Sequence, residues 1–169
     1  MPNHVVLYQP EIPANTGNIS RTCAGTDTHL HLIRPLGFST EDKMLKRAGL
    51  DYWDHVNLTY YDSLEDFFEK NPDGHYYMIT KFGRHLYSDV DYSDARENHY
   101  FIFGKETTGL PDELLRKHEE TALRIPMTDK IRSLNLSNTA AILVYEALRQ
   151  QTFLDLDQMP HYDRKIFED

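Results

Sequence analysis

The sequence predicts an α/β fold in which a mostly parallel sheet is flanked by helices. Short apolar runs of the kind found in buried strands alternate with segments whose apolar residues recur at helical spacing. The run at 100–103 is apolar at every position, so both faces of that strand must be covered, as in a parallel sheet. A length of 169 residues favours a single domain.

The strands are expected where apolar runs or alternating patterns are short and bounded by turns. They lie at 5–8, 30–33, 56–60, 76–80, 100–103 and 122–125. Pro10 and Pro13 end the first, and the turn Asn-Pro-Asp-Gly at 71–74 precedes the fourth. The polar stretch 81–98 predicts no regular element.

Helices are expected between these strands, at 15–23, 40–48, 64–70, 111–118 and 137–151. Asn15 suits the N-cap of the first helix, and Gly49 stands where a glycine often ends a helix. Ser63 and Asp66 resemble a capping box with Asp in place of Glu. The last helix has a wide apolar face, which predicts that it is largely buried.

Charge limits the function classes. The formal net charge is -9, which opposes broad nonspecific binding to nucleic acid. The acidic excess is uneven: residues 51–98 hold four Lys and Arg against eleven Asp and Glu, whereas residues 99–150 hold seven of each. A local basic patch outside the acidic segment is therefore compatible with the composition.

Targeting signals are not evident in the sequence. No stretch approaches the roughly 18 consecutive apolar residues of a transmembrane helix. The N-terminal residues lack the basic and then apolar pattern of a signal peptide. Cys23 is the single cysteine, so no intrachain disulfide can form, and a cytoplasmic protein is expected.

Three polar, mostly glycine-bearing segments follow predicted strands, at 15–22, 103–111 and 125–138. The carboxyl ends of parallel strands meet at one edge of the sheet, where ligands of such folds bind. Small hydrogen-bonding side chains beside an apolar wall are typical of a small-molecule site. We therefore expect the three segments to surround one site.

Several familiar chemistries are excluded by their missing patterns. The dinucleotide-binding G-x-G-x-x-G does not follow the first strand, and the second glycine of Gly104–Gly109 is followed by Leu and Pro rather than the Lys and Ser or Thr of a P-loop. His29 and His31 fall on a strand and the other histidines are scattered, which does not indicate a metal site. No G-x-S-x-G hydrolase motif occurs.

Three segments resemble the three motifs of the SPOUT superfamily of RNA methyltransferases: NTGNISRT at 15–22, FGKETTGLP at 103–111, and IPM at 125–127 with RSLNLSN at 132–138. Two more, VVLYQPEIP at 5–13 and KRAGLDYW at 46–53, bring the likeness close to one branch. That branch is the small tRNA (cytidine/uridine-34)-2′-O-methyltransferases, which consist of the catalytic domain alone. The expected division is a domain at 1–151 and a C-terminal tail at 152–169.

The resemblance implies a C-terminal third threaded as a deep trefoil knot, which the hydrophobic pattern does not reveal. It also implies a homodimer, no metal, and S-adenosylmethionine as methyl donor. The RNA would be the anticodon loop of tRNA, in leucine tRNAs, methylated on the ribose of a cytidine or modified uridine at position 34. Carried over position by position, the donor-binding residues are Ile79, Gly104, Ile125, Met127, Ser133 and Leu134.

The resemblance further implies Arg21, Ser133 and Asn135 as catalytic residues. The implied substrate contacts are Asn15, Arg21, Lys46, Arg47, Glu106, Arg132 and Tyr145. Related families have an arginine proposed as the base at the position of Arg21. Arginine holds its proton in nearly all proteins, so we expect Arg21 to clamp a phosphate beside the target ribose, with the proton acceptor unassigned.

Alternatives remain open at this point. The same fold could act on another RNA such as ribosomal RNA, the chain could be a non-catalytic module that binds donor or RNA, or it could be a small-molecule enzyme. Gly104 could permit close approach of a ligand or only a turn. Glu106 could bind a ligand amine or brace its loop. Ser133 and Asn135 could bind a ligand or cap the last helix.

Overall fold

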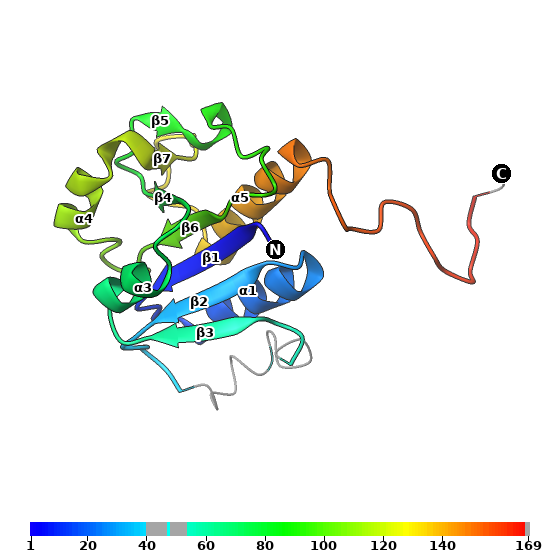
Figure 1. The fold of residues 1–169 in the computed structure, drawn as a ribbon, viewed down its shortest axis with the longest axis horizontal. Helices are drawn as coiled ribbons and strands as arrows, with labels where there is room; N and C mark the ends of the chain where they lie inside the picture. Colours follow the sequence, from blue (N-terminus) through cyan, green and yellow to red (C-terminus); the bar gives the residue numbers. More distant parts are fainter. Residues whose placement is uncertain (40–46, 48–53, 168–169) are drawn as a thin grey trace.

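The computed structural model describes residues 1–39, 47 and 54–167. Its centre is a seven-stranded sheet in the order β3-β2-β1-β6-β4-β7-β5, in which every pairing is parallel (Figure 1). The strands are β1 (Asn3–Tyr8), β2 (His29–Ile33), β3 (Leu58–Tyr61), β4 (His75–Ile79), β5 (His85–Leu86), β6 (His99–Phe103) and β7 (Ala122–Arg124). Strand β6 is buried at every residue and β1 at every residue but Tyr8, and both lie near the middle of the sheet, as their continuous apolar runs predict.

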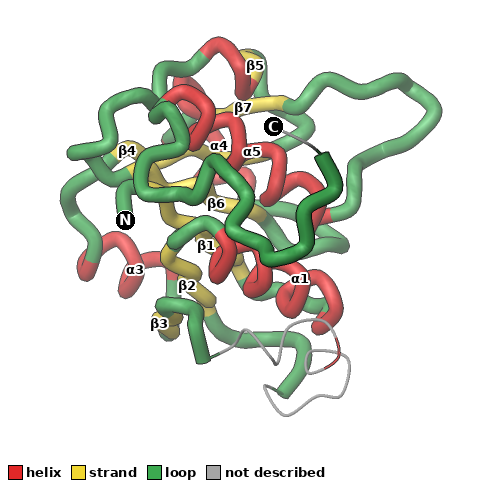
Figure 2. The backbone as a smooth tube through the Cα atoms, turned by 90° about the vertical axis from the view of Figure 1, so that its right-hand side faces the viewer, coloured by secondary structure: helices red, strands yellow, loops and turns green. Residues whose placement is uncertain are grey.

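Helices cover both faces of this sheet. They are α1 (Pro13–Gly25), α3 (Leu64–Lys70), α4 (Asp112–Lys117) and α5 (Leu136–Gln150), with short 3-10 turns η1 (Tyr87–Asp89) and η2 (Glu119–Thr121). Helices α1 and α5 pack on each other and on one face, while α3 lies on the opposite face (Figure 2). The molecule is therefore a three-layer α/β structure.

Alternation along β1 divides the core in two. Val5 and Leu7 face α1 and α5, whereas Val6 faces the layer that contains α3 and α4. The larger cluster includes Leu143 and Val144 of α5, which are fully buried. This burial fixes α5 against the sheet and so fixes where its first turn lies.

Most expected elements are confirmed, with their ends shifted by at most two residues. Asn15 is not the N-cap of α1, because Pro13 begins the helix and Ile12 is the N-cap. The stretch 81–98 is not wholly irregular, since it contains β5 and η1. The capping interaction is confirmed, with Ser63 Oγ accepting from Asp66 N at 3.0 Å. The helix expected at 40–48 lies outside the described residues, apart from position 47.

The chain beyond α5 first folds back and then leaves the body. Phe153 and Leu156 pack against the larger core cluster. Residues 159–167 are exposed and extend away from the sheet (Figure 1). Within the described part of the chain, no helix is long and apolar enough to span a membrane.

Candidate functional site

A cavity of about 630 Å³ opens at the edge where the strands of the sheet end. Its wall is apolar where it meets the core, with Ile79, Phe103 and Ile125 at the ends of β4, β6 and β7. Its rim is polar and comes from the segments that follow β1, β4, β6 and β7. The expected meeting of the three polar segments at one place is thus observed, and the volume falls within the range of small-molecule sites.

Asn135 ties two of these segments together. Its Nδ2 donates to Asn15 Oδ1 at 3.1 Å, across 120 residues of sequence. Its Oδ1 accepts from Ser137 N at 2.9 Å and from Asn138 N at 3.4 Å, which makes Asn135 the N-cap of α5. One amide therefore ends the loop, starts α5 and holds the first turn of α1.

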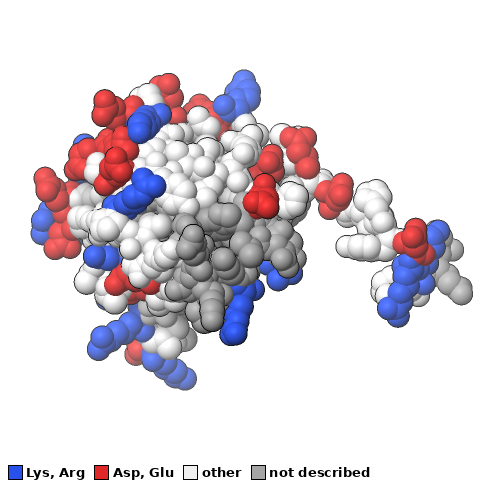
Figure 3. Space-filling view, turned by 90° about the horizontal axis from the view of Figure 1, so that it is seen from below, with Lys and Arg blue, Asp and Glu red and all other residues white. Residues whose placement is uncertain are grey.

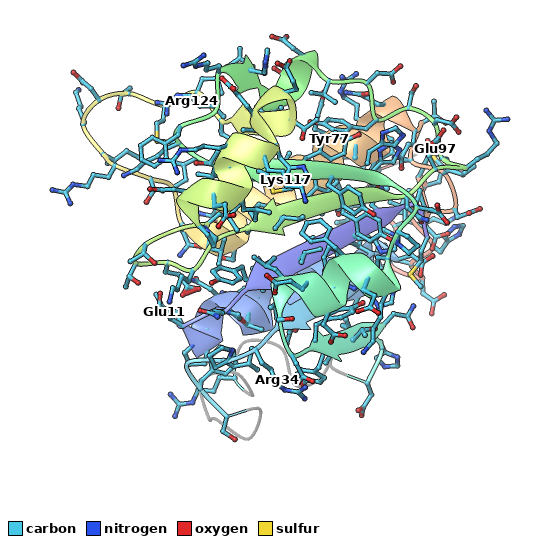
Figure 4. The ribbon with its side chains drawn as sticks, turned by 60° about the vertical axis from the view of Figure 1, so that its left-hand side comes forward. Glu11, Arg34, Tyr77, Glu97, Lys117 and Arg124 are labelled. Atoms are coloured by element: carbon cyan, nitrogen blue, oxygen red, sulfur yellow. The ribbon has the colours of Figure 1, made fainter. Side chains whose placement is uncertain are left out.

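Glu106 and Glu11 form a reciprocal clasp between the segments after β6 and β1. Glu106 Oε2 accepts from the backbone N–H of Glu11 at 2.8 Å and of Ile12 at 3.0 Å. Glu11 Oε1 accepts from the backbone N–H and the hydroxyl of Thr107, at 3.1 and 2.7 Å. The two bonds from Thr107 lower the pKa of the Glu11 carboxyl. Glu11 lies at the edge where the strands end, opposite Glu97 (Figure 4).

The clasp shows that Glu106 braces its loop. Its second oxygen, Oε1, is buried and has no protein partner among the described residues. Glu106 also lines the cavity. A buried acceptor without a partner is costly, so this oxygen is available to a donor group of a bound ligand. Bracing and ligand binding can therefore coexist in this side chain.

Gly104 is needed for the loop to close on itself. A Cβ at this position would lie 2.2 Å from the carbonyl carbon of Gly109 and 2.4 Å from Leu110 N. Gly109 has a φ of 72°, which favours glycine. The side of Gly104 on which a Cβ would stand is therefore filled by the backbone of Gly109 and Leu110. Gly104 also lines the cavity. The space that Gly104 provides is used by the protein, rather than being left for a ligand.

The structure brings most of the expected site residues to this cavity. All six residues expected to bind a donor line it: Ile79, Gly104, Ile125, Met127, Ser133 and Leu134. Of the expected catalytic and substrate residues, Asn15, Glu106, Arg132 and Asn135 also line it.

Arg21 and Tyr145 are not among the cavity residues of this chain. Asn15 faces the cavity from the start of α1, and Arg21 follows it six residues later, about 9 Å along the axis and roughly 120° around it. Arg21 and Arg47 are exposed, and Lys46 lies outside the described residues. Tyr145 is 49% exposed on α5 and is not a core residue. Arg21 and Tyr145 thus lie on the α1 and α5 layer, outside the cavity.

The cavity also contains residues that the sequence analysis left out. Thr80, Lys81 and Phe82 follow β4 and line the rim, and Thr139 contributes from the first turn of α5. The sequence does point to these residues, because they follow the carboxyl end of the strand expected at 76–80, where ligands of parallel sheets bind, as the other three segments follow theirs. That segment, however, lacks the dense set of small polar side chains found in the other three.

His4 of β1 meets His29 and His31 of β2 at the opposite edge of the sheet. One ring nitrogen of each of His4, His29 and His31 lies within 4.8 Å of the others. The His29 and His31 rings, however, are stacked, with centroids 4.1 Å apart and planes 11° from parallel. A metal binds a nitrogen lone pair in the plane of each imidazole, so two stacked rings cannot share one ion. This arrangement is not a metal centre.

A chain of hydrogen bonds accounts for two of these histidines instead. Asn98 Nδ2 donates to Asp73 O, so Asn98 Oδ1 accepts from His4 Nε2 at 3.0 Å. His4 Nδ1 then accepts from His31 Nε2 at 2.9 Å, and His31 Nδ1 accepts from the Tyr61 hydroxyl at 2.7 Å. Burial lowers the pKa of His4 to about 4 and that of His31 to about 2, so both are neutral near pH 7.

Charge at the cavity differs from charge over the whole chain. Lys81, Lys105 and Arg132 line the cavity, against the single carboxylate of Glu106. Elsewhere acidic groups dominate, and on the face seen in Figure 3 the Lys and Arg side chains of the described residues are scattered. A local excess of cations at the site is therefore present on an acidic protein.

Comparisons relate this geometry to known proteins. The model of the SpoU rRNA Methylase family matches residues 2–145. A candidate tRNA (cytidine(34)-2′-O)-methyltransferase from Listeria innocua is 79% identical over 169 residues, 100% of both chains. A structure described as "Structural insights into the 2-OH methylation of C/U34 on tRNA" is 44% identical, has a TM-score of 0.83, and covers 90% of this chain and 99% of that chain. An AdoMet-bound rRNA methyltransferase from Sinorhizobium meliloti is 25% identical, has a TM-score of 0.77, and covers 87% of this chain and 56% of that chain.

Proposed function

The chain belongs to the SpoU rRNA Methylase family, and from that premise we propose that it methylates the ribose 2′-oxygen of the wobble nucleotide of tRNA. The methyl donor is S-adenosylmethionine, and the target is a cytidine or a modified uridine at position 34. The observation that carries the proposal is the convergence of the motif segments on one cavity. The names of full-length relatives support tRNA rather than ribosomal RNA as the substrate. A tRNA substrate supports a cytoplasmic location, which is part of this proposal.

The cavity suits the donor in its size and in the arrangement of its apolar and polar walls. Ile79, Phe103 and Ile125 offer an apolar surface to a purine ring, and Ser133 supplies polar groups near it. The pairing of β4 with β7 ends at Ile79 and Leu123, with one further bond from Thr80 N to Leu123 O, so the backbone beyond this point would pair with the purine edge. The orphan oxygen of Glu106 suits an ammonium or hydroxyl donor. When bound, S-adenosylmethionine supplies a methyl group bonded to a sulfonium.

The chain's own residues position the RNA. The ribose 2′-oxygen forms the new bond to the methyl carbon as the carbon–sulfur bond breaks, and the hydroxyl proton leaves to an acceptor that is not assigned. Alignment of the reacting atoms supplies much of the rate. Arg21 clamps the phosphate beside the target ribose, and Arg132 and Lys105 at the rim attract the same backbone. Asn135 holds the α1 and α5 segments in register.

We also propose that the enzyme acts as a homodimer in which Arg21 serves the cavity of the partner. The position of Arg21 on α1, outside the lining of the cavity of its own chain, supports this arrangement. Exposed Tyr145 on the neighbouring α5 would then lie near the subunit contact. The chain after β6 would be threaded as the SPOUT trefoil knot. The strand order β6-β4-β7, followed by the return of α5 to β1 and β6, supports that threading.

The reaction is tested with labelled donor and tRNA that lacks the modification at position 34. We expect one methyl group per acceptor tRNA, mapped to the 2′-oxygen of that nucleotide, and no transfer when this ribose is 2′-deoxy. Label in ribosomal RNA but not in tRNA would favour the alternative substrate. Arg21→Ala should lower transfer strongly, with Arg21→Lys partly active. Near-normal transfer by Arg21→Ala, with loss in Asn135→Ala, would contradict the role of Arg21.

Subunit mixing tests the dimer arrangement. Arg21→Ala and Asn135→Ala chains, each nearly inactive alone, are unfolded together and refolded as a mixture. If Arg21 acts across the dimer, each mixed dimer contains one site with both residues intact, and activity returns. If both residues act within one chain, no site is intact and the mixture stays inactive.

A further inference from the structure

Two large apolar side chains are exposed at the rim of the cavity. Ile12 is 45% exposed and Phe82 is 70% exposed. Single exposed apolar residues are common on protein surfaces, so exposure alone assigns no role. Phe82 differs in how its backbone is held and in which charges surround it.

The turn that carries Phe82 is fixed by the backbone around it. Phe82 N donates to Thr80 Oγ1 at 3.1 Å, and Gly83 N donates to Thr80 O at 3.2 Å. Arg124 Nη1 donates to Lys81 O at 2.6 Å. Gly83 lies so close to β7 that a Cβ there would be 2.6 Å from a strand carbonyl carbon. A rigid turn thus displays the phenyl ring, and ordering that ring on a ligand costs little entropy.

The charges around Phe82 favour a polyanion. Lys81 Nζ lies 5.2 Å from the centroid of the Phe82 ring, and Lys105 and Arg132 line the same cavity. The same rim of a second copy is a poorer occupant here. A symmetric contact would set these same cations against each other. A flat apolar ring beside cations matches the base and phosphate of a single-stranded nucleic acid.

We propose that Phe82 is a stacking platform for a nucleobase of the anticodon loop, with Lys81 holding an adjoining phosphate. This proposal rests on the proposed function. One face of the ring stacks on the base beside the donor cavity, and Lys81 contacts RNA backbone instead of the ring. Phe82 is then a substrate-positioning residue that sets how the loop enters the site.

The test compares Phe82→Ala, Phe82→Leu and Phe82→Trp in binding to a labelled anticodon stem-loop, with donor affinity measured in parallel. Removing a stacked base contact should weaken RNA binding by about 5- to 150-fold, with donor affinity unchanged. Phe82→Leu should be nearly as weak as Phe82→Ala because it has no π face. Phe82→Trp should bind at least as well as the parent. Phe167→Ala removes a phenylalanine of the tail that is 86% exposed, serves as the control and should bind normally.

A 2-aminopurine placed in the loop reports stacking directly. Its fluorescence should be quenched on binding to the parent and to Phe82→Trp, and less so with Phe82→Ala. The proposal is overturned if Phe82→Leu binds like the parent, if Phe167→Ala weakens binding equally, or if Phe82→Ala changes the oligomeric state and not RNA affinity. Failure of the proposed function is recognised separately, because the parent protein would then transfer no methyl group to tRNA.

Discussion

Asn135 shows at the scale of one residue how a single side chain can join two elements. Its amide oxygen caps α5 while its amide nitrogen bonds Asn15. A cap is worth about 1 kcal/mol and a neutral hydrogen bond about the same. Mutation of Asn135 therefore affects both the start of α5 and the position of α1.

Asn135→Ala should lower the free energy of unfolding by about 1–3 kcal/mol, because both interactions are lost. Asn135→Asp is the matched variant, since it keeps the capping oxygen and loses the donor to Asn15. It should retain most of the stability while methyl transfer falls. Urea titration and a transfer assay measure the two effects. Equal destabilisation by both variants would mean that the cap is not the larger stabilising contribution.

The sequence could indicate which residues gather at the site, but not always why. The motif resemblance selected Gly104 and Asn135, and both line the cavity. The reason for Gly104 is the backbone of Gly109, which depends on how the loop closes and not on local pattern. The direction of Arg21 depends on where α1 begins. Moving the N-cap from Asn15 to Ile12 rotates every later residue by about 300° relative to the cap.

At the scale of elements, the parallel sheet was predictable because buried strands are short and apolar at most positions. Strand β5 was not predictable, because it has only two residues, both exposed, which cannot show an alternating hydrophobic pattern. The histidine cluster was also hidden. His4 faces His29 only because β1 pairs with β2 in that register, and sequence spacing does not contain this information.

This cluster predicts a fall in stability at mildly acidic pH. The pKa of His4 is about 4 in the folded state, below the ordinary value of 6.5, because burial opposes the charge. Above pH 6.5 both states are neutral and stability is unaffected. As pH falls toward 4 the unfolded chain binds protons first, so stability decreases, by about 3 kcal/mol for His4 alone. His31 adds to the loss in the same direction.

His4→Gln provides the control for this prediction. Glutamine keeps a donor and an acceptor but does not titrate. The free energy of unfolding of the parent, measured in urea between pH 7 and 5, should drop more steeply than that of the variant. Parallel profiles for the two proteins would show that His4 is not the source of the pH dependence.

At the scale of the whole molecule, the tail divides into a packed part and an exposed part. Phe153 and Leu156 contact the core, whereas residues 159–167 are exposed. Deletion of 159–169 should therefore change the free energy of unfolding by less than about 0.5 kcal/mol. Deletion of 152–169 should cost about 1–3 kcal/mol, because it uncovers apolar surface. A large loss from the shorter deletion would indicate that the distal tail packs on the body in solution.

The negative net charge and the small number of cations at the cavity predict that RNA affinity falls only moderately as the salt concentration rises. The chain carries a net charge of -9, and its cations at the cavity are few: Lys81, Lys105 and Arg132. With the Arg21 proposed to come from the partner subunit, these make four phosphate contacts, and four contacts to single-stranded RNA give a slope of about -3 for log affinity against log salt concentration. Arg132→Gln should make this slope shallower by about 0.7. Arg96→Gln is the matched control, because Arg96 pairs with Asp94 before β6, at the opposite edge of the sheet, and should leave the slope unchanged. An equal effect of both variants, or a slope several times steeper, would mean that the RNA covers far more of the surface than the cavity rim.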